Sequence, residues 1–284
     1  ILMYYFLRRR FDLKVSFVST LLFLTSGCFI FHLHRHIMFV DYMPFLLMAL
    51  IGVDKYFDKK KIPLLVISIF LMILTSYYFS VVGLVCVLLY GIFRYIEDKR
   101  NDKITAKDFF REGFKFIFIM LIPVLLSCFL LLPTAYSLLD GRTATNKSIS
   151  LLGLLIPNFD ISNTLYSSYS LGLSAIFIIA LIYGIITKKC EVKVISIIFS
   201  VLLVFPIFDY IFNGGMYLNG KAFIPLLPLA ILIIGYFLKN IFNNKNKLKI
   251  SIIISLIVVV INLLIFVYKN EYVCLLFVLD MAHL

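Results

Sequence analysis

The sequence has none of the short motifs that mark nucleotide or hydrolase chemistry. It contains no P-loop, no GxGxxG, no GxSxG and no HExxH motif. Each of these motifs places a phosphate-binding loop, a nucleophile or a metal on a particular strand or helix. Their absence leaves nucleotide chemistry at the cytoplasmic side unsupported.

Paired cysteines are also lacking. The five cysteines lie within or beside apolar runs, without a CxxC pair, at Cys28, Cys86, Cys128, Cys190 and Cys274. We interpret them as small hydrophobic residues rather than as disulfides or metal ligands.

The N-terminus lacks an initiator methionine and a signal-peptide pattern. An apolar stretch runs directly into Arg8, Arg9 and Arg10, which resembles the last turns of an earlier membrane span. We therefore expect residues 1–284 to form a single transmembrane domain that lacks an N-terminal span and a first outer loop.

Apolar residues, by contrast, are abundant. The chain has 284 residues, of which 62% are hydrophobic and 29 are phenylalanine, and its mean hydropathy is +1.04. Soluble domains average about 45–50% apolar residues on a list that includes glycine. No soluble core could bury this excess, so the sequence predicts a polytopic membrane protein built as an all-α transmembrane bundle.

Nine spans are expected, since a membrane helix needs about 20 apolar residues and fewer when it is short. The ranges are 15–31, 37–53, 63–77, 79–95, 115–133, 171–187, 194–212, 222–238 and 250–268. The apolar segment 63–95 is too long for one ordinary span, and both of its flanks are rich in lysine. A hairpin of two short helices that turns at residues 76–80 returns both flanks to one side.

The positive charge is distributed unevenly over the predicted loops. The net charge is +12, and 22 of the 27 lysines and arginines fall in the segments 8–14, 54–61, 94–115, 188–193 and 239–249. Cytoplasmic loops carry such an excess, so these segments are predicted to lie inside. The basic residues then act as topological anchors, which argues against a nucleic-acid partner.

Two extramembrane segments have their own character. Residues 94–115 mix charge with phenylalanines and predict a short interfacial helix on the cytoplasmic surface. Residues 134–170 form a long outer loop, whose apolar run at 149–157 predicts a helix on the outer face. A loop of this length is usually functional or disordered.

The candidate catalytic residue is Asp41, which lies about 18 Å up a helix from the lysine cluster, at about 1.5 Å per residue. An ionisable group at that depth is costly and points to function. Asp41 could equally pair with Arg35 or a histidine at headgroup level. Together with Asp209 it could form a two-carboxylate or divalent-cation site, or each carboxylate could cap its helix locally.

A histidine-bound metal has weaker support. His32 and His36 have the i, i+4 spacing that two ligands on one helix would need. No third ligand is evident, and we expect these residues to lie in a tight turn rather than on a helix. We therefore predict no metal at these histidines.

Three cations depart from the charge rule, because Arg35, Arg142 and Lys221 lie in predicted outer segments. They could bind a lipid phosphate or pyrophosphate through charge-assisted hydrogen bonds, or simply contact headgroups. Tyr77 and Tyr78 belong either to an interfacial aromatic belt or to a platform on which a sugar stacks.

Several of these residues also carry a family resemblance. Ser26–Gly27, Asp41, Pro44 and Gly52 before a lysine run resemble the pattern of bacterial YfhO-type membrane proteins. Further matches are Ser76-Tyr77-Tyr78-Phe79, Leu131-Leu132-Pro133 and Gly141-Arg142. The resemblance covers residues 15–145 well and the remainder by hydropathy.

The resemblance implies a C-type glycosyltransferase architecture. Such enzymes transfer a sugar from a polyprenyl-phosphate-linked donor to a cell-envelope polymer, such as teichoic acid, on the outer face of the membrane. Their acidic catalytic residue usually lies in the first outer loop, which this chain would lack. Their arginine near the glycine-rich outer loop corresponds here to Lys221.

Two other classes remain open. A transporter or flippase of lipid-linked glycans would also need charge within the membrane, usually spread over several spans near the midplane. Most spans from residue 63 onward lack ionisable residues, apart from Asp209, which favours an enzyme at the outer face. The third class is a scaffold subunit without chemistry of its own.

Overall fold

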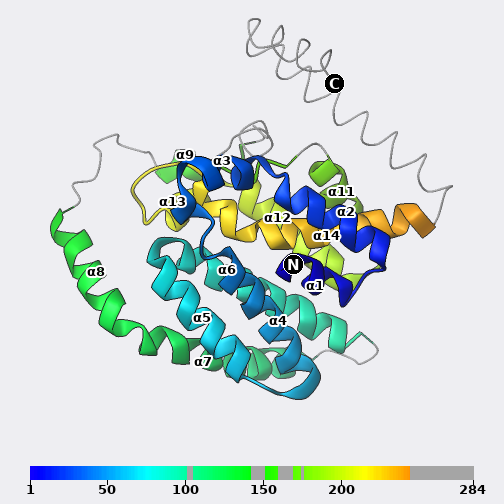
Figure 1. The fold of residues 1–284 in the computed structure, drawn as a ribbon, viewed down its shortest axis with the longest axis horizontal. Coiled ribbons are helices and arrows are strands. Elements are labelled where there is room, and N and C mark those ends of the chain that lie inside the picture. The colour runs from blue at the N-terminus through cyan, green and yellow to red at the C-terminus, as the bar shows by residue number, and fades with distance from the viewer. Residues whose placement is uncertain (101–104, 142–150, 159–168, 174–175, 244–284) are drawn as a thin grey trace, which may run out of the picture.

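The chain folds as a bundle of α-helices in a computed structural model (Figure 1). The structure describes residues 1–100, 105–141, 151–158, 169–173 and 176–243. These residues contain helices, turns and irregular segments but no strand. The predicted all-α class is confirmed.

Residues 1–100 form six α-helices and one 3-10 helix. They are α1 (Leu2–Arg8), α2 (Leu13–Leu24), α3 (Gly27–Arg35), η1 (Ile37–Phe39), α4 (Met43–Lys59), α5 (Pro63–Thr75) and α6 (Tyr77–Asp98). Pro44 and Pro63 lie in the first turns of α4 and α5, where a missing N–H is tolerated. Lys60 ends α4 in the left-handed conformation, with φ of 54°.

The described residues from 105 to 243 form the remaining helices. They are α7 (Ala106–Leu126), α8 (Cys128–Gly141), α9 (Leu151–Leu155), α11 (Ile176–Ile186), α12 (Cys190–Val204), α13 (Pro206–Phe212), η2 (Gly220–Leu226) and α14 (Leu227–Asn243). Helix α14 packs against α2, α11 and α12. In the segment from η2 to α14, 94% of the apolar window is buried, so this segment is the central helix of the bundle.

The predicted hairpin is present. Helix α5 ends at Thr75, and α6 begins at Tyr77 with the Ser76 hydroxyl accepting a hydrogen bond from the Phe79 amide at 3.5 Å. A Cβ atom on Gly83 of α6 would lie 2.7 Å from the Met72 sulfur of α5. This close approach shows that α5 and α6 pack directly against each other.

The number of spans differs from the nine expected. Among the described residues, three helices are long and apolar enough to cross a membrane, or up to six if each bent pair counts as one span. The ranges 15–31, 115–133 and 194–212 each contain a break, with bends of 47°, 72° and 84°. The sharpest break directly precedes Pro206, which disfavours helical geometry in the residue before it.

The remaining ranges fare differently. Two predicted spans, 63–77 and 171–187, correspond to the shorter helices α5 and α11. The range 250–268 lies outside the described residues. The count of nine spans is therefore not confirmed.

The short interfacial helix predicted at 94–115 is not a separate element. Helix α6 continues to Asp98, and α7 begins at Ala106, where the Thr105 hydroxyl accepts a hydrogen bond from the Asp108 amide at 3.4 Å. The described charged residues of this segment thus lie at the end of α6, directly after it, or in the first half of α7. In the predicted outer loop 134–170, α8 extends to Gly141 and the apolar run contains α9.

The predicted orientation can be tested by labelling in intact cells. In a variant whose native cysteines are replaced, a cysteine at Asn219 should react with a membrane-impermeant thiol reagent, and one at Lys61 should react only after permeabilisation. Both positions are exposed, so access to the residue itself is not limiting. Labelling of Lys61→Cys from outside would reverse the orientation inferred from the charges.

Candidate functional site

Two groups of polar side chains lie at opposite ends of helix α6. Arg94 belongs to one group and Tyr78 to the other, and their separation of 16 positions corresponds to roughly 24 Å at about 1.5 Å per residue. This length is comparable to the hydrocarbon core of a bilayer, which is about 30 Å thick. The charge pattern predicts that the Tyr78 end lies outside.

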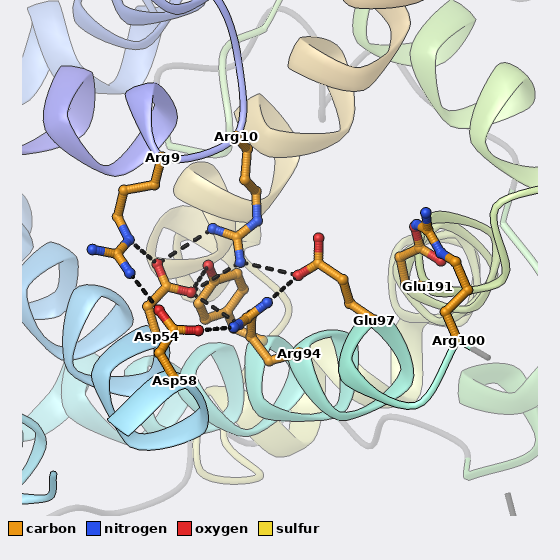
Figure 2. Close-up of polar contacts among 9 residues, drawn as sticks. Arg9, Arg10, Asp54, Asp58, Arg94, Glu97, Arg100 and Glu191 are labelled. Atoms are coloured by element: carbon orange, nitrogen blue, oxygen red, sulfur yellow. Dashed lines mark hydrogen bonds and ion pairs between the residues drawn. The ribbon is translucent and has the colours of Figure 1, made fainter. Parts of the chain in front are cut away.

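The first group, here called the Asp54 network, surrounds a fully buried carboxylate (Figure 2). Its members come from the α1–α2 turn, α4 and α6, and are Arg9, Arg10, Asp54, Asp58, Tyr90, Arg94 and Glu97. The Asp54 side chain is only 1% exposed, and its oxygens lie 2.9 Å from Arg9 Nε, 2.9 Å from Arg10 Nη2 and 3.1 Å from Arg94 Nε. The Tyr90 hydroxyl donates to Asp54 Oδ1 at 2.7 Å.

The other two carboxylates complete the charge balance. Asp58 pairs with Arg9 at 2.7 Å and with Arg94, while Glu97 pairs with Arg10 at 3.2 Å and with Arg94. Three arginines therefore face three carboxylates. Burial opposes the charge of Arg10, but Tyr90, Asp54 and Glu97 outweigh it and raise the pKa of the guanidinium.

This network is a structural element rather than a reaction centre. Its charges sum to zero, and its arginines are engaged by carboxylates instead of being directed at an open space. Removal of one partner from a buried pair is costly because it leaves an uncompensated buried charge. The sequence pattern marked these arginines only as topological anchors, and no spacing along the chain indicated that they pair.

A second buried carboxylate lies nearby on α12. Glu191 is fully buried and pairs with Arg100, which follows α6 (Figure 2). The pair ties the end of α6 to the start of α12. It therefore extends the ionic contacts at this end of the bundle.

The second group, here called the Lys221 cluster, lies at the other end of α6. It comprises Phe39, Tyr78, Asp209, Asn213, Tyr217 and Lys221. The Lys221 ammonium lies 4.7 Å from the centre of the Tyr217 ring, 5.0 Å from that of Tyr78 and 6.0 Å from that of Phe39. These distances suit cation–π attraction, and in the described part of the chain no carboxylate forms an ion pair with Lys221.

Asn213 organises this cluster. Its side chain is almost fully buried, and its Nδ2 group donates to Asp209 Oδ1 at 2.7 Å and to the Asn219 carbonyl at 3.2 Å. The Tyr78 hydroxyl donates to Asn213 Oδ1 at 2.5 Å. One amide thus joins α6, α13 and the glycine-rich loop (residues 213–221), and fixes Asp209 in place.

Asp41 lies at the same end of the bundle. It follows Phe39 by two residues, which keeps the two Cα atoms within about 7 Å. Phe39 stacks on His32 with ring centres 4.3 Å apart, and it also contacts Phe79 of α6 at 5.0 Å. An aromatic layer therefore connects the turn that carries Asp41 with the Lys221 cluster.

The Asp41 carboxylate itself is half-buried, and its Oδ1 atom is buried without a hydrogen-bond partner among the described residues. It forms no ion pair with Arg35 or with a histidine in that part of the chain, so the local pairing considered for it is not observed. A half-buried carboxylate oxygen with no partner can accept a proton or a hydrogen bond from a bound molecule.

The other predicted site residues are placed less centrally. Arg35 is exposed, with its guanidinium 5.7 Å from the Phe31 ring centre, and Tyr77 is 39% exposed. Arg142 lies outside the described residues, so its contribution to a site with Asp41 stays a prediction. Of the seven predicted residues, Tyr78, Asp209 and Lys221 are brought together.

The expectation of a tight turn at His32 was wrong. Helix α3 continues through His32 to Arg35, and only His36 leaves helical geometry, because the apolar period extends past the first histidine. The His32 and His36 rings lie 6.2 Å apart. No group of three residues able to hold a metal occurs in the described ranges.

Sequence reasoning missed Asn213, Tyr217 and Phe39 as members of the cluster. One signal lay in the glycine-rich loop, where Gly215, Gly220 and Lys221 have the spacing of a P-loop up to its lysine. However, Ala222 occupies the position of the required Ser or Thr, and a short helix rather than a strand precedes the loop. The loop presents a lysine without forming a nucleotide site.

The role of the Asp54 network can be tested by unfolding in detergent. Asp54→Asn should lower the free energy of unfolding by about 3–5 kcal/mol, because three arginines then surround an uncharged group. Asp58→Asn is the matched control, since its side chain is 40% exposed, and should cost at most about 1 kcal/mol. Equal small losses in both variants would contradict a structural role for Asp54.

Comparison with known proteins identifies the family. The family model described as bacterial membrane protein YfhO matches residues 1–281, so the match extends well beyond the segment that carried the resemblance. Searches of curated proteins and of solved structures found no match. A family model that spans the chain, a helical fold and helices able to cross a membrane agree: the chain belongs to the YfhO family of bacterial membrane proteins.

Proposed function

We propose that the protein is a membrane glycosyltransferase that takes a sugar from a polyprenyl-phosphate-linked donor and transfers it to a cell-envelope polymer outside the cell. The observation that carries this proposal is the Lys221 cluster. It combines Lys221, which forms no ion pair with a described carboxylate, with aromatic rings and the Asp209 carboxylate, and Asp41 lies at the same end of the bundle.

In this proposal, each of the main side chains of the site has its own chemical role. Lys221 attracts the donor phosphate and balances the charge that develops on it as the glycosidic bond breaks. The rings of Tyr78 and Tyr217 offer faces against which a sugar can stack. Asp41, with its unpartnered oxygen, accepts the proton of the acceptor hydroxyl.

The same arrangement argues against the flippase alternative. A carrier of charged headgroups needs polar groups along its path, usually near the midplane. In the described part of α6, the charged residues are confined to Arg94 and the residues after it, and the polar contacts of Tyr78 lie at the opposite end. Polar groups at two ends with an apolar middle favour a reaction at one membrane face.

Lys221→Gln should reduce polymer glycosylation roughly 10–100-fold, because a hydrogen bond to a charged group contributes about 1.5–3 kcal/mol. Arg35→Gln is the control, since Arg35 is a cation on the same predicted side but is exposed and outside the cluster. Glycosylation would be measured in cells at matched membrane levels of each variant. Equal activity of Lys221→Gln and the natural protein would exclude this site.

A second assay separates the enzyme from a flippase. Donor lipid supplied directly to the outer leaflet bypasses a transport step but not a transfer step. The defect of Lys221→Gln should therefore persist under these conditions. Full recovery would assign the protein to transport instead.

Asp41→Asn should lower the transfer rate by about 10²–10⁴-fold, the usual contribution of a positioned general base. The substitution keeps the volume of the side chain and removes its charge. Variants that accumulate to normal levels and retain activity would show that Asp41 is not the base. Failure of Asp41→Asn to accumulate would assign the residue a structural role.

A further inference from the structure

Three cations from distant parts of the chain meet beside the Asp54 network, and they are here called the Lys189 cluster. Arg100 follows α6, Lys189 lies in the turn between α11 and α12, and Lys239 lies near the end of α14. All three belong to segments that the charge pattern predicts to lie inside. The cluster arises from the packing of these segments and not from a local run of lysines.

The two lysines of the cluster lie against one pair of aromatic rings. The Phe11 and Tyr236 rings meet edge to face, with their centres 4.9 Å apart. The Lys189 ammonium lies 4.8 Å from the centre of the Tyr236 ring, and the Lys239 ammonium lies 5.9 Å from that of Phe11. Lys239 Nζ also donates to the Arg10 carbonyl at 3.3 Å. Both lysines are half-buried, so their side chains are held by packing.

The charges of these cations oppose one another. Partial burial lowers the pKa of Lys189, and the charges of Lys239 and Arg100 lower it further. Glu97 acts in the opposite direction but has a smaller effect than either cation. Neighbouring like charges disfavour the charged form of a group. Within the described ranges neither lysine forms an ion pair, so nothing there neutralises the repulsion.

The carboxylates near the cluster are engaged by arginines. Glu97 pairs with Arg10 and Arg94 in the Asp54 network, whose own charges sum to zero. Glu191 is fully buried and pairs with Arg100 (Figure 2). Once these pairs are counted, the charges of the two lysines remain unbalanced. The arrangement therefore suits an anionic ligand.

We propose that Lys189 and Lys239 bind a phosphate group. Phosphate oxygens accept charge-assisted hydrogen bonds, and lysine is a common phosphate ligand. The group can belong to the headgroup of an anionic phospholipid in the leaflet at this end, or to a soluble phosphate, because both present the same oxygens. The site does not depend on the glycosyltransferase proposal, since it lies at the other end of α6 from the Lys221 cluster.

The test is the thermal stability of the detergent-solubilised protein with added ligand, because a ligand that binds only the folded state raises Tm. One arm adds sodium phosphate, with sodium chloride at equal ionic strength as its reference. The other arm adds phosphatidylglycerol, with phosphatidylcholine of identical acyl chains as its reference. The natural protein should show a rise in at least one arm, and that arm identifies the source of the phosphate.

Lys189→Gln and Lys239→Gln should each weaken the binding at least about tenfold, the effect of losing one hydrogen bond to a charged group. Lys189→Arg keeps the charge and should bind as the natural protein does. Lys188→Gln is the matched control, because Lys188 lies in the same turn but is exposed and outside the cluster. Each variant is compared with its own ligand-free form, so a change in intrinsic stability does not enter the result.

Three outcomes would overturn the proposal. The first is that neither phosphate nor phosphatidylglycerol raises the Tm of the natural protein above its reference. The second is an undiminished rise in Lys189→Gln or in Lys239→Gln. The third is an equal loss in Lys188→Gln, which would assign the effect to the net charge of this surface.

Discussion

A buried carboxylate in an apolar bundle must be paired, and the pairing of Asp54 fixes one end of this fold. Its oxygens contact arginines from the α1–α2 turn and from α6. An unpaired charge buried away from water has a high free-energy cost. Separation of these three segments would therefore leave a buried charge without its partner or expose it. The constraint is geometric as well as energetic, since three planar guanidinium groups converge on one carboxylate.

Helix α6 carries this constraint to the rest of the molecule. Its C-terminal end is locked by the Asp54 network, and its N-terminal end presents Tyr78 to Asn213 and Lys221. A site built on a loop needs rigid support of this kind. Helix α6 therefore links the Asp54 network at one end to the Lys221 cluster at the other.

Some of this arrangement follows from sequence patterns. Apolar length and lysine flanks predicted the α5–α6 hairpin, and Ser76 predicted its turn. Lys221 was a candidate because it is a cation in a predicted outer segment, where the positive-inside rule expects few. Asp209 was a candidate because it is a carboxylate within an apolar range. These features are local, so residue order was sufficient to find them.

Other features depend on contacts between distant segments. Arg10 and Asp54 are 44 residues apart, and no periodicity links them, so their charges appeared to be loop anchors. Asn213 joins Tyr78 and Asp209 through one amide, a role that its position in a polar loop did not reveal. The breaks within three predicted spans depend on local backbone geometry. Hydropathy, which is averaged over a window of residues, does not detect them.

The burial of the central helix has a consequence for biogenesis. From Gly220 to Asn243, nearly every apolar side chain contacts protein rather than surroundings. Its partners α2, α11 and α12 are all synthesised earlier. Their surfaces that contact α14 therefore cannot reach their final packing until α14 has emerged from the ribosome. Completion of the core is thus a late event in the life of the nascent chain, set by the order of its segments.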